Sequence, residues 1–347
     1  MKINRFFLAT LVVAGVFTAC SNDEAVQESK DGNAISFRVQ GGTPSLRTTA
    51  TTVANVDAFV VYGTDNEAVA KSDPAIFSGV TVARKVGSAT AFDYNPKKYY
   101  SENAELAQFA AFSPVSSNIT YSAASPLFSY AGGFSFDYTV KKPGDAGVGK
   151  TAQEDLLVAG ITQDATAGTV QFDFKHALAR IFVKASSSLS EPVIIRELTL
   201  RNLYPSGKIS SSTPTAVAGT VWAWSWIPSG TKTYYSYILA PSGVAVDPAT
   251  VAPILVTSME QGMMVIPQAT VNADDDVEAG DFALEVKYDV ANLTNQFAYM
   301  YLTDGYSFNM GTQYAITVTF NMTVTHLIEI DFSISVGNFD NDPTTMP

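Results

Sequence analysis

Apolar and polar side chains alternate along most of the chain with the two-residue period of a β-strand. The alternating segments are short and rich in β-branched and aromatic residues, and Gly, Pro, Asn and Asp separate them. The pattern predicts strands over Ala34–Val39, Val56–Tyr62, Ile76–Val82, Ala107–Phe112, Phe134–Val140, Leu156–Gly160, Val170–Phe174, Ala179–Lys184, Ile194–Leu200, Thr220–Ile227, Tyr234–Leu239, Met263–Ile266, Asp281–Val290, Phe297–Leu302, Tyr314–Thr325 and Leu327–Val336.

About sixteen short strands with frequent turn signals and few helical patterns are typical of all-β sandwiches. Two sandwiches of about seven strands each fit a chain of 347 residues. The small-residue turn Asp164–Gly168 lies between two of the predicted strands. We therefore expect an N-terminal sandwich over 48–166 and a C-terminal sandwich over 167–347.

The last predicted strand has the most regular alternation. Its apolar face consists of Ile328, Ile330, Phe332, Ile334 and Val336. Fully buried, each of these side chains contributes roughly 1.5–3 kcal/mol, so the strand is suited to fill an apolar groove. The first predicted strand repeats the pattern in shorter form, with an apolar face of Ile35, Phe37 and Val39.

The segment after the first strand, 41–52, is rich in Gly and Thr and contains one basic residue, Arg47. We expect it to be extended and exposed, and exposed segments of this kind are where proteolysis concentrates. Cleavage after Arg47 would remove the first strand and leave a groove with unpaired strand edges. Such edges accept a strand from another chain by donor-strand complementation. An ordinary solvated linker is the alternative interpretation of this segment.

Residues 1–19 have the form of an export signal. Lys2 and Arg5 precede the apolar run Phe6–Thr18, which is shorter than the ~20 residues of a membrane-spanning helix. The residues that end in Cys20 resemble a bacterial lipobox, in which the cysteine is acylated and becomes the new N-terminus. An ordinary signal peptide with a chance cysteine is the alternative, but Cys20 is the one cysteine in the sequence. The sequence therefore predicts lipidation at Cys20.

Composition narrows the function classes further. The chain has 21 Lys+Arg against 33 Asp+Glu, a net charge of -12, which disfavours nucleic-acid binding. A single cysteine excludes a disulfide framework and a cysteine-rich metal site.

Known catalytic motifs are absent from the sequence, and we expect neither an enzyme nor a bound cofactor. His176 lies between apolar strand residues, which favours a structural role over a catalytic one. The cluster Asp274–Asp276 has calcium-binding chemistry but lacks the ligand spacing of a calcium loop, so a solvated loop is favoured.

Trp222, Trp224 and Trp226 alternate within Val221–Ile227, and a period of two would place all three on one face of a sheet. Exposed, the three indoles would form a platform for stacking on sugars. Buried, they would be part of the core. The pattern favours the core, and a surface glycan-binding lipoprotein is the alternative function.

Taken in order and spacing, several segments resemble the fimbrillins, the subunits of type V pili. They are the lipoprotein signal with Cys20, the first strand Ala34–Val39 with Arg47 after it, Glu154–Gly160, Phe174–Ile181, Met263–Gln268, and Gly311–Val318 leading into the final strands. The resemblance implies two tandem transthyretin-like β-sandwich domains. It also implies export to the outer membrane as a lipoprotein and polymerisation with other pilin subunits at the cell surface in support of adhesion.

The resemblance assigns a role to each terminal segment. Residues 1–19 are the signal peptide and 20–47 a propeptide that includes the first strand. A maturation protease cuts after Arg47, so Thr48 becomes the mature N-terminus. Leu327–Val336 is the donor segment, with the apolar face Ile328, Ile330, Phe332, Ile334 and Val336. The strand it replaces is Ala34–Val39, which carries Ile35, Phe37 and Val39. The lipid anchor then holds the protein before maturation, and the host or bacterial surface ligand is open.

Overall fold

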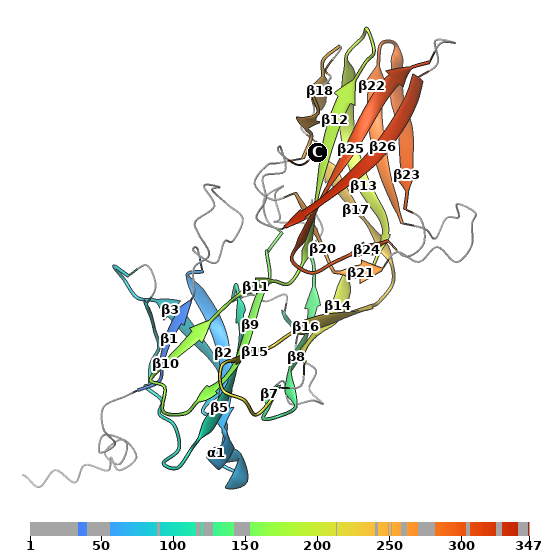
Figure 1. Cartoon of the computed structure of the whole chain (residues 1–347). Coiled ribbons are helices and arrows are strands. Elements are labelled where there is room, and N and C mark those ends of the chain that lie inside the picture. Colours follow the sequence, from blue (N-terminus) through green and yellow to red (C-terminus); the bar gives the residue numbers. More distant parts are fainter. Residues whose placement is uncertain are drawn as a thin grey trace, which may run out of the picture.

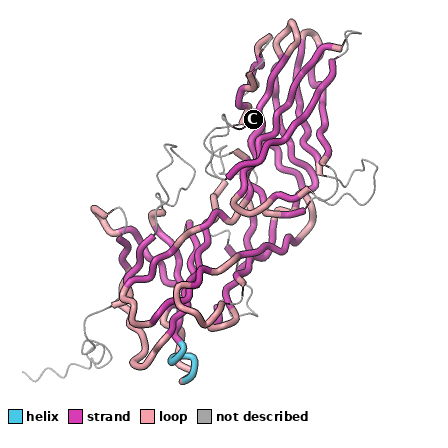
Figure 2. The backbone as a smooth tube through the Cα atoms, viewed as in Figure 1, coloured by secondary structure: helices cyan, strands magenta, loops and turns pink. Residues whose placement is uncertain are grey.

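The computed structural model describes residues 34–39, 56–88, 91–115, 119–120, 128–141, 153–212, 214–239, 242–248, 250, 252–257, 262–269, 282–302, 306–323, 328–338 and 346. Within these residues every element but one is a β-strand, as Figure 2 shows, and the all-β prediction is confirmed. The exception is the five-residue helix α1 (Asn66–Ala70), whose N-cap Asp65 accepts a hydrogen bond from the backbone N–H of Ala68.

The largest sheet forms most of the lower lobe in Figure 1 and contains nine of the described strands. Its strand β1 (Ser36–Val39) lies between β10 (Thr169–Phe172) and β4 (Ala91–Asp93). The sheet continues from β4 through β3 (Phe77–Arg84), β2 (Ala58–Asp65), β5 (Leu106–Ser113), β9 (Leu157–Asp164) and β11 (Lys175–His176), with β15 (Thr220–Val221) also paired to β9.

Two five-stranded sheets form the upper lobe (Figure 1). They face each other, because the rings of Tyr288 in one and Phe320 in the other are 5.0 Å apart. The first has the order β19 (Ile254–Leu255), β12 (Ala179–Ser187), β25 (Thr312–Met322), β26 (Ile328–Asn338), with β20 (Met263–Val265) on β12. The second has the order β17 (Thr233–Ile238), β13 (Val193–Leu203), β22 (Ala283–Val290), β23 (Leu293–Tyr301), with β18 (Val244–Val246) on β13.

A further sheet lies between the two lobes in Figure 1. Its central strands β8 (Gly133–Thr139) and β14 (Ser206–Ser211) come from distant parts of the chain. The remaining described strands are β16 (Trp224–Ser229) on β14, β6 (Ile119–Thr120) and β7 (Phe128–Ser129) on β8, and the separate pair β21 (Gln268–Ala269) and β24 (Ser307–Phe308).

Strands β2, β5 and β9 are buried on both faces, which explains their nearly continuous apolar sequences. Phe59 and Phe109 point into the core of the nine-stranded sheet. On the same two strands, Val60 and Phe112 point the other way, into a larger core that continues through β8 and β14 to both sheets of the upper lobe. Among the described residues, the core on one face of β2, β5 and β9 is thus continuous with the core of the upper lobe.

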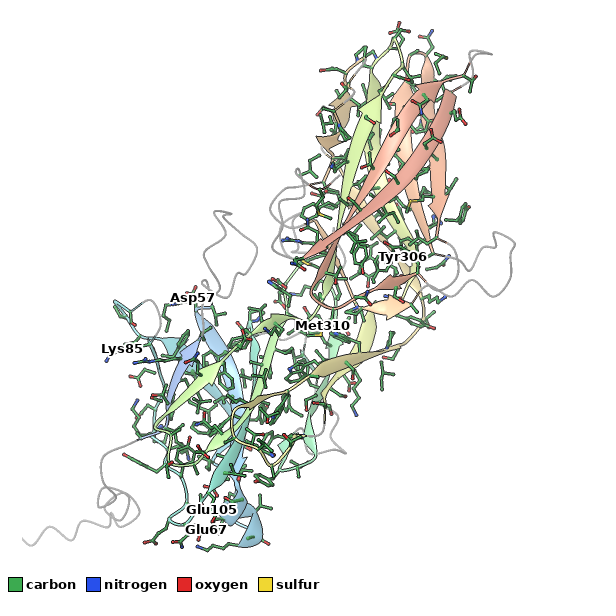
Figure 3. The ribbon with its side chains drawn as sticks, viewed as in Figure 1. Asp57, Glu67, Lys85, Glu105, Tyr306 and Met310 are labelled. Atoms are coloured by element: carbon green, nitrogen blue, oxygen red, sulfur yellow. The ribbon has the colours of Figure 1, made fainter. Side chains whose placement is uncertain are left out.

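Hydrogen bonds join the lobes where they meet. The Gln153 side chain donates to the carbonyl of Met264 and accepts from its N–H, at 3.1 and 2.9 Å. In Figure 3, Tyr306 and Met310 mark this lower end of the upper sandwich, while Glu67 and Glu105 lie at the far end of the lower lobe.

The strand pairing bears on where the domains divide. Strands β10 and β11 follow residue 166, and both pair with strands of the nine-stranded sheet. Strand β12, which begins at Ala179, is the first that pairs within the upper lobe. We therefore propose a domain boundary after His176 in place of the expected one at 166/167. In this division, residues 206–229 return from the upper lobe and pack on the lower lobe.

Candidate functional site

Strand β1 is an interior strand of the nine-stranded sheet. It pairs in parallel with β10, where Phe37 is opposite Val170, and antiparallel with β4, where Phe37 is opposite Phe92. The two edges of β1 are therefore both in use. Removal of β1 would therefore break backbone pairing on both of its sides. In the sheet order of the described strands, β10 pairs with β1 alone and would lose that pairing.

The residues at the start of β1 are fixed on both sides as well. The N–H of Ile35 donates to the carbonyl of Lys98 at 2.9 Å, and the N–H of Ser36 donates to that of Gly168 at 2.9 Å. The Tyr94 hydroxyl donates to the carbonyl of Ile35 at 2.6 Å. Burial raises the pKa of Tyr94 to about 12, so the hydroxyl keeps its proton over the physiological range.

Phe37 lies at the centre of an aromatic cluster and is 1% exposed. Its ring centroid is 5.3 to 6.2 Å from those of five other rings, four of them in edge-on contact and one stacked. The five are Phe59, Phe77, Tyr94, Phe109 and Phe172. Ile35 and Val39 are buried on the same side, so removal of β1 would open an apolar groove in the middle of this core.

Strand β26 has a different environment. Its eleven residues pair antiparallel with β25, and among the described strands it has no other partner. Ile328, Ile330, Phe332 and Ile334 pack against the core but are only partly buried. Val336 is 58% exposed. The apolar face expected for this strand is present, and its own sandwich buries that face incompletely.

The structure does not bring the two terminal strands together. In Figure 1, β1 lies in the lower lobe and β26 crosses the upper lobe. Cys20, Arg47 and Thr48 lie outside the described residues, as does Leu327 at the start of the predicted last strand.

The three tryptophans pack inward. Trp222 is 3% exposed, covers the backbone of Gly160, and donates from its indole N–H to the Thr162 hydroxyl at 3.2 Å. Trp224 and Trp226 are half-buried on the larger core, and the Trp226 indole donates to the carbonyl of Ala177 at 2.7 Å. The alternative of an exposed sugar-stacking platform is wrong for these three residues, because their rings pack against the core and the indole N–H groups of Trp222 and Trp226 donate to protein acceptors.

His176 has a structural setting, as expected. Its Nδ1 lies 2.9 Å from the Asp155 carboxylate, and both side chains are buried beside the junction of the lobes. Among the described residues no group of three His, Cys, Asp or Glu side chains is placed to hold a metal ion, and Asp274–Asp276 lie outside that set. No described helix has the length and apolar character that spanning a membrane requires.

Several residues that surround β1 could not be identified from the sequence pattern. Tyr94 and Lys98 follow the short strand β4, and Phe172 comes from β10, which lies beyond the expected domain boundary at 166/167. Aromatic enrichment in Val170–Phe174 was visible in the sequence, but nothing in it identified β1, more than 130 residues away, as the partner.

Comparison with solved structures shows the fold. A candidate cell adhesion protein from Bacteroides uniformis matches 89% of this chain and 99% of its own with a TM-score of 0.51 at 15% identity. One from Bacteroides ovatus matches 88% and 97% with a TM-score of 0.47 at 14% identity. The tip fimbrial protein Mfa3 from Porphyromonas gingivalis, truncated at its C-terminus, matches 86% and 98% with a TM-score of 0.43 at 8% identity.

Comparison with sequences shows the family. No individual curated protein matches the chain. A model of the fimbrillin-like family, in contrast, matches residues 47–336, which is most of the chain. The chain therefore belongs to the fimbrillin-like family, whose members are structural and adhesive proteins rather than enzymes.

Proposed function

We propose that this protein is a subunit of a cell-surface fimbria that polymerises by donor-strand exchange. It is exported as a lipoprotein acylated on Cys20, and a protease then cuts after Arg47. The trimmed subunit, beginning at Thr48, has lost β1 and accepts a strand from a neighbouring subunit in its place. Its partners are other fimbrial subunits, and the filament supports adhesion.

The observation that carries the proposal is the position of β1. The first residues of a domain are usually poorly ordered unless they are tied into the fold. Here Ile35, Phe37 and Val39 are almost fully buried in the interior of the nine-stranded sheet. Removal of β1 would expose two strand edges and an apolar groove, and neither is stable in water without a replacement strand.

The proposed replacement is β26 of another subunit. It has the same apolar alternation as β1 over a longer stretch, so alternate side chains would enter the groove while the backbone pairs with β10 and β4. Its side chains are half-buried in their own sandwich, and full burial in the groove would gain apolar contact that the isolated subunit lacks.

The extent of the family match supports the same division. The matched region begins at Arg47, where cleavage is proposed, and ends at Val336, the last apolar residue of the proposed donor face. The first strand therefore lies outside the region that the family model describes, as expected for a segment that is absent from the mature subunit.

A peptide test separates the groove from the rest of the mechanism. Protein trimmed to begin at Thr48 is mixed with a fluorescent peptide of sequence 327–338, and the full-length precursor is the control. We expect the trimmed protein to bind the peptide in a stable complex, whereas the precursor, whose groove is filled by β1, does not. Equal binding to both forms, or binding of a peptide with Asp at the positions of Ile330 and Phe332, would contradict the proposal.

The glycan-binding alternative based on Trp222, Trp224 and Trp226 has lost its support. Trp222 is buried, and Trp224 and Trp226 are half-buried against the core, so the three indoles do not form an exposed platform.

A further inference from the structure

One face of the upper sandwich carries exposed aromatic side chains on its edge strand. In β23, Ala298 and Met300 point into the core, and the side chains between and beside them point outward. The outward residues Phe297, Tyr299 and Tyr301 are 49%, 43% and 39% exposed. Large apolar groups gathered on a surface in this way mark interaction sites in soluble proteins.

The register of the sheet places polar side chains directly beside these rings. Glu285 of β22 is opposite Tyr299, and Lys287 is opposite Phe297. On the next strand, Arg201 of β13 reaches Glu285 with a guanidinium–carboxylate distance of 2.6 Å. We call the six residues Arg201, Glu285, Lys287, Phe297, Tyr299 and Tyr301 the tyrosine face.

Two of the three rings on the tyrosine face lie close together. The Tyr299 and Tyr301 rings lie 6.1 Å apart, and their planes are inclined by only 22°. The Lys287 ammonium lies 5.9 Å above the Phe297 ring, within the range of a cation–π contact. Two nearly parallel rings, each about 40% exposed, offer apolar surface to a ligand.

The polar groups on the face are held in place. The Glu285 carboxylate is largely buried between the Arg201 guanidinium and the Tyr299 hydroxyl, to which it is hydrogen-bonded. That hydrogen bond raises the pKa of Tyr299. The guanidinium itself stays about half exposed, so it keeps donors for a ligand while the carboxylate fixes its position.

The charge of the face differs from that of the whole protein. The chain carries a net charge of -12, but on this face Arg201 is matched by Glu285, and Lys287 is opposite Glu197. A locally balanced face neither attracts a polyanion nor favours a polycation. It complements an uncharged ligand that has apolar surfaces for the rings and hydroxyl groups for the polar side chains.

We infer that the tyrosine face binds a neutral oligosaccharide. Pyranose rings stack with their C–H faces on Tyr299 and Tyr301, and their hydroxyl groups exchange hydrogen bonds with Arg201, Glu285 and the tyrosine hydroxyls. The inference concerns an adhesion ligand and does not depend on strand exchange, since none of its residues lies on β1 or β26.

A second copy of the chain is the competing occupant, because β23 is the last strand of its sheet path and pairs with β22 alone among the described strands. Edge-to-edge pairing uses the backbone, whereas these rings project from the face of the sheet. The centres of protein interfaces are depleted in Lys and Glu, whereas Lys287 and Glu285 adjoin the rings here. Both observations favour the sugar.

The test measures binding of defined sugars to the full chain. Maltohexaose, cellohexaose, chitohexaose and mannohexaose are titrated by calorimetry, with a heparin hexasaccharide as the charged control. We expect saturable binding of at least one neutral sugar at millimolar concentration or below, and no comparable binding of heparin. The double variant Tyr299→Ala, Tyr301→Ala should weaken that binding about tenfold or more. Leu293→Ala, an exposed site on the same strand but away from the polar groups, should leave it unchanged.

A second measurement needs no variant. On the wild-type chain, the bound sugar should protect Tyr299 and Tyr301 from nitration by tetranitromethane, while exposed Tyr234 on β17 reacts as before. Three results would overturn the inference. They are no saturable binding of any neutral sugar, binding that survives the double variant, and self-association of the chain that the double variant abolishes.

Discussion

Phe37 of β1 stacks on Phe172 of β10 with the ring centroids 5.8 Å apart and the planes only 3° from parallel. The two residues are 135 positions apart, and both are fully buried. This contact ties a segment proposed to be removed during maturation to the centre of the lower lobe. Its loss is the event that would make the subunit ready to polymerise.

Phe37→Ala in the full-length precursor should lower the free energy of unfolding by about 3–5 kcal/mol, because it leaves a cavity among five aromatic rings. Denaturant unfolding of the purified precursor measures the change. Arg38→Ala on the same strand, whose side chain is exposed, is the matched control and should have little effect. Equal stability of the two variants would show that β1 is not part of the core.

Ile330→Asp together with Phe332→Asp should abolish filament formation, because two charges cannot enter an apolar groove. Electron microscopy of surface-released protein gives the result. The matched control replaces Glu329 and Asp331 on the exposed face with Ser and should still polymerise. The double Asp variant should still accept wild-type donor peptide, which shows that its own groove is intact. Filaments made of the double Asp variant would rule out β26 as the donor.

Trp222→Ala should destabilise the protein by about 3–5 kcal/mol, because it removes a buried indole packed on Gly160. Gly160→Ala should also destabilise it, by about 1–3 kcal/mol, since a Cβ there would lie 2.4 Å from the Trp222 ring. Thermal unfolding measures both effects. Variants of normal stability would revive an exposed role for this indole.

Much of the fold was predictable because alternation identifies a half-buried strand by itself. Strands β1, β12, β25 and β26 were located in this way. Strand β14 was missed because Ser206–Ser211 is polar and sends mainly Ile209 into the core. Helix α1 was missed because five residues are too few to show a helical period.

The candidate site was predictable only in part. The apolar faces of the first and last strands follow from sequence, since a period of two assigns each residue to a face. The partners of those strands do not, because pairing between β1 and β10 depends on how a long chain folds back. Trp222 shows a further limit of the pattern. Strand β15 ends at Val221 and β16 begins at Trp224, so the predicted single strand is broken beside this residue.

Cys20→Ser should prevent lipidation, so the precursor should lose its attachment to the membrane. Metabolic labelling with palmitate followed by membrane fractionation checks this. A conservative change at the neighbouring Ser21, Ser21→Thr, is the control and should keep the label. Palmitate retained by the Cys20 variant would show that another residue carries the lipid, or that the signal has a different form.

Arg47→Ala should block maturation, because Arg47 is the one basic residue in the segment after the first strand. The variant should accumulate at precursor size, and it should form no filaments because β1 still fills the groove. Arg47→Lys keeps the positive charge, and comparison of this variant with Arg47→Ala separates loss of the charge from the change of side chain. Immunoblotting of surface fractions measures the size, and normal filaments of the Ala variant would refute the assignment.

The most direct measurement is the N-terminal sequence of protein released from the surface as filaments. Strand exchange after cleavage at Arg47 predicts a single N-terminus at Thr48, with Cys20 and β1 both absent. Filaments whose subunits begin at a blocked Cys20, and therefore retain β1, would contradict strand exchange in the lower lobe.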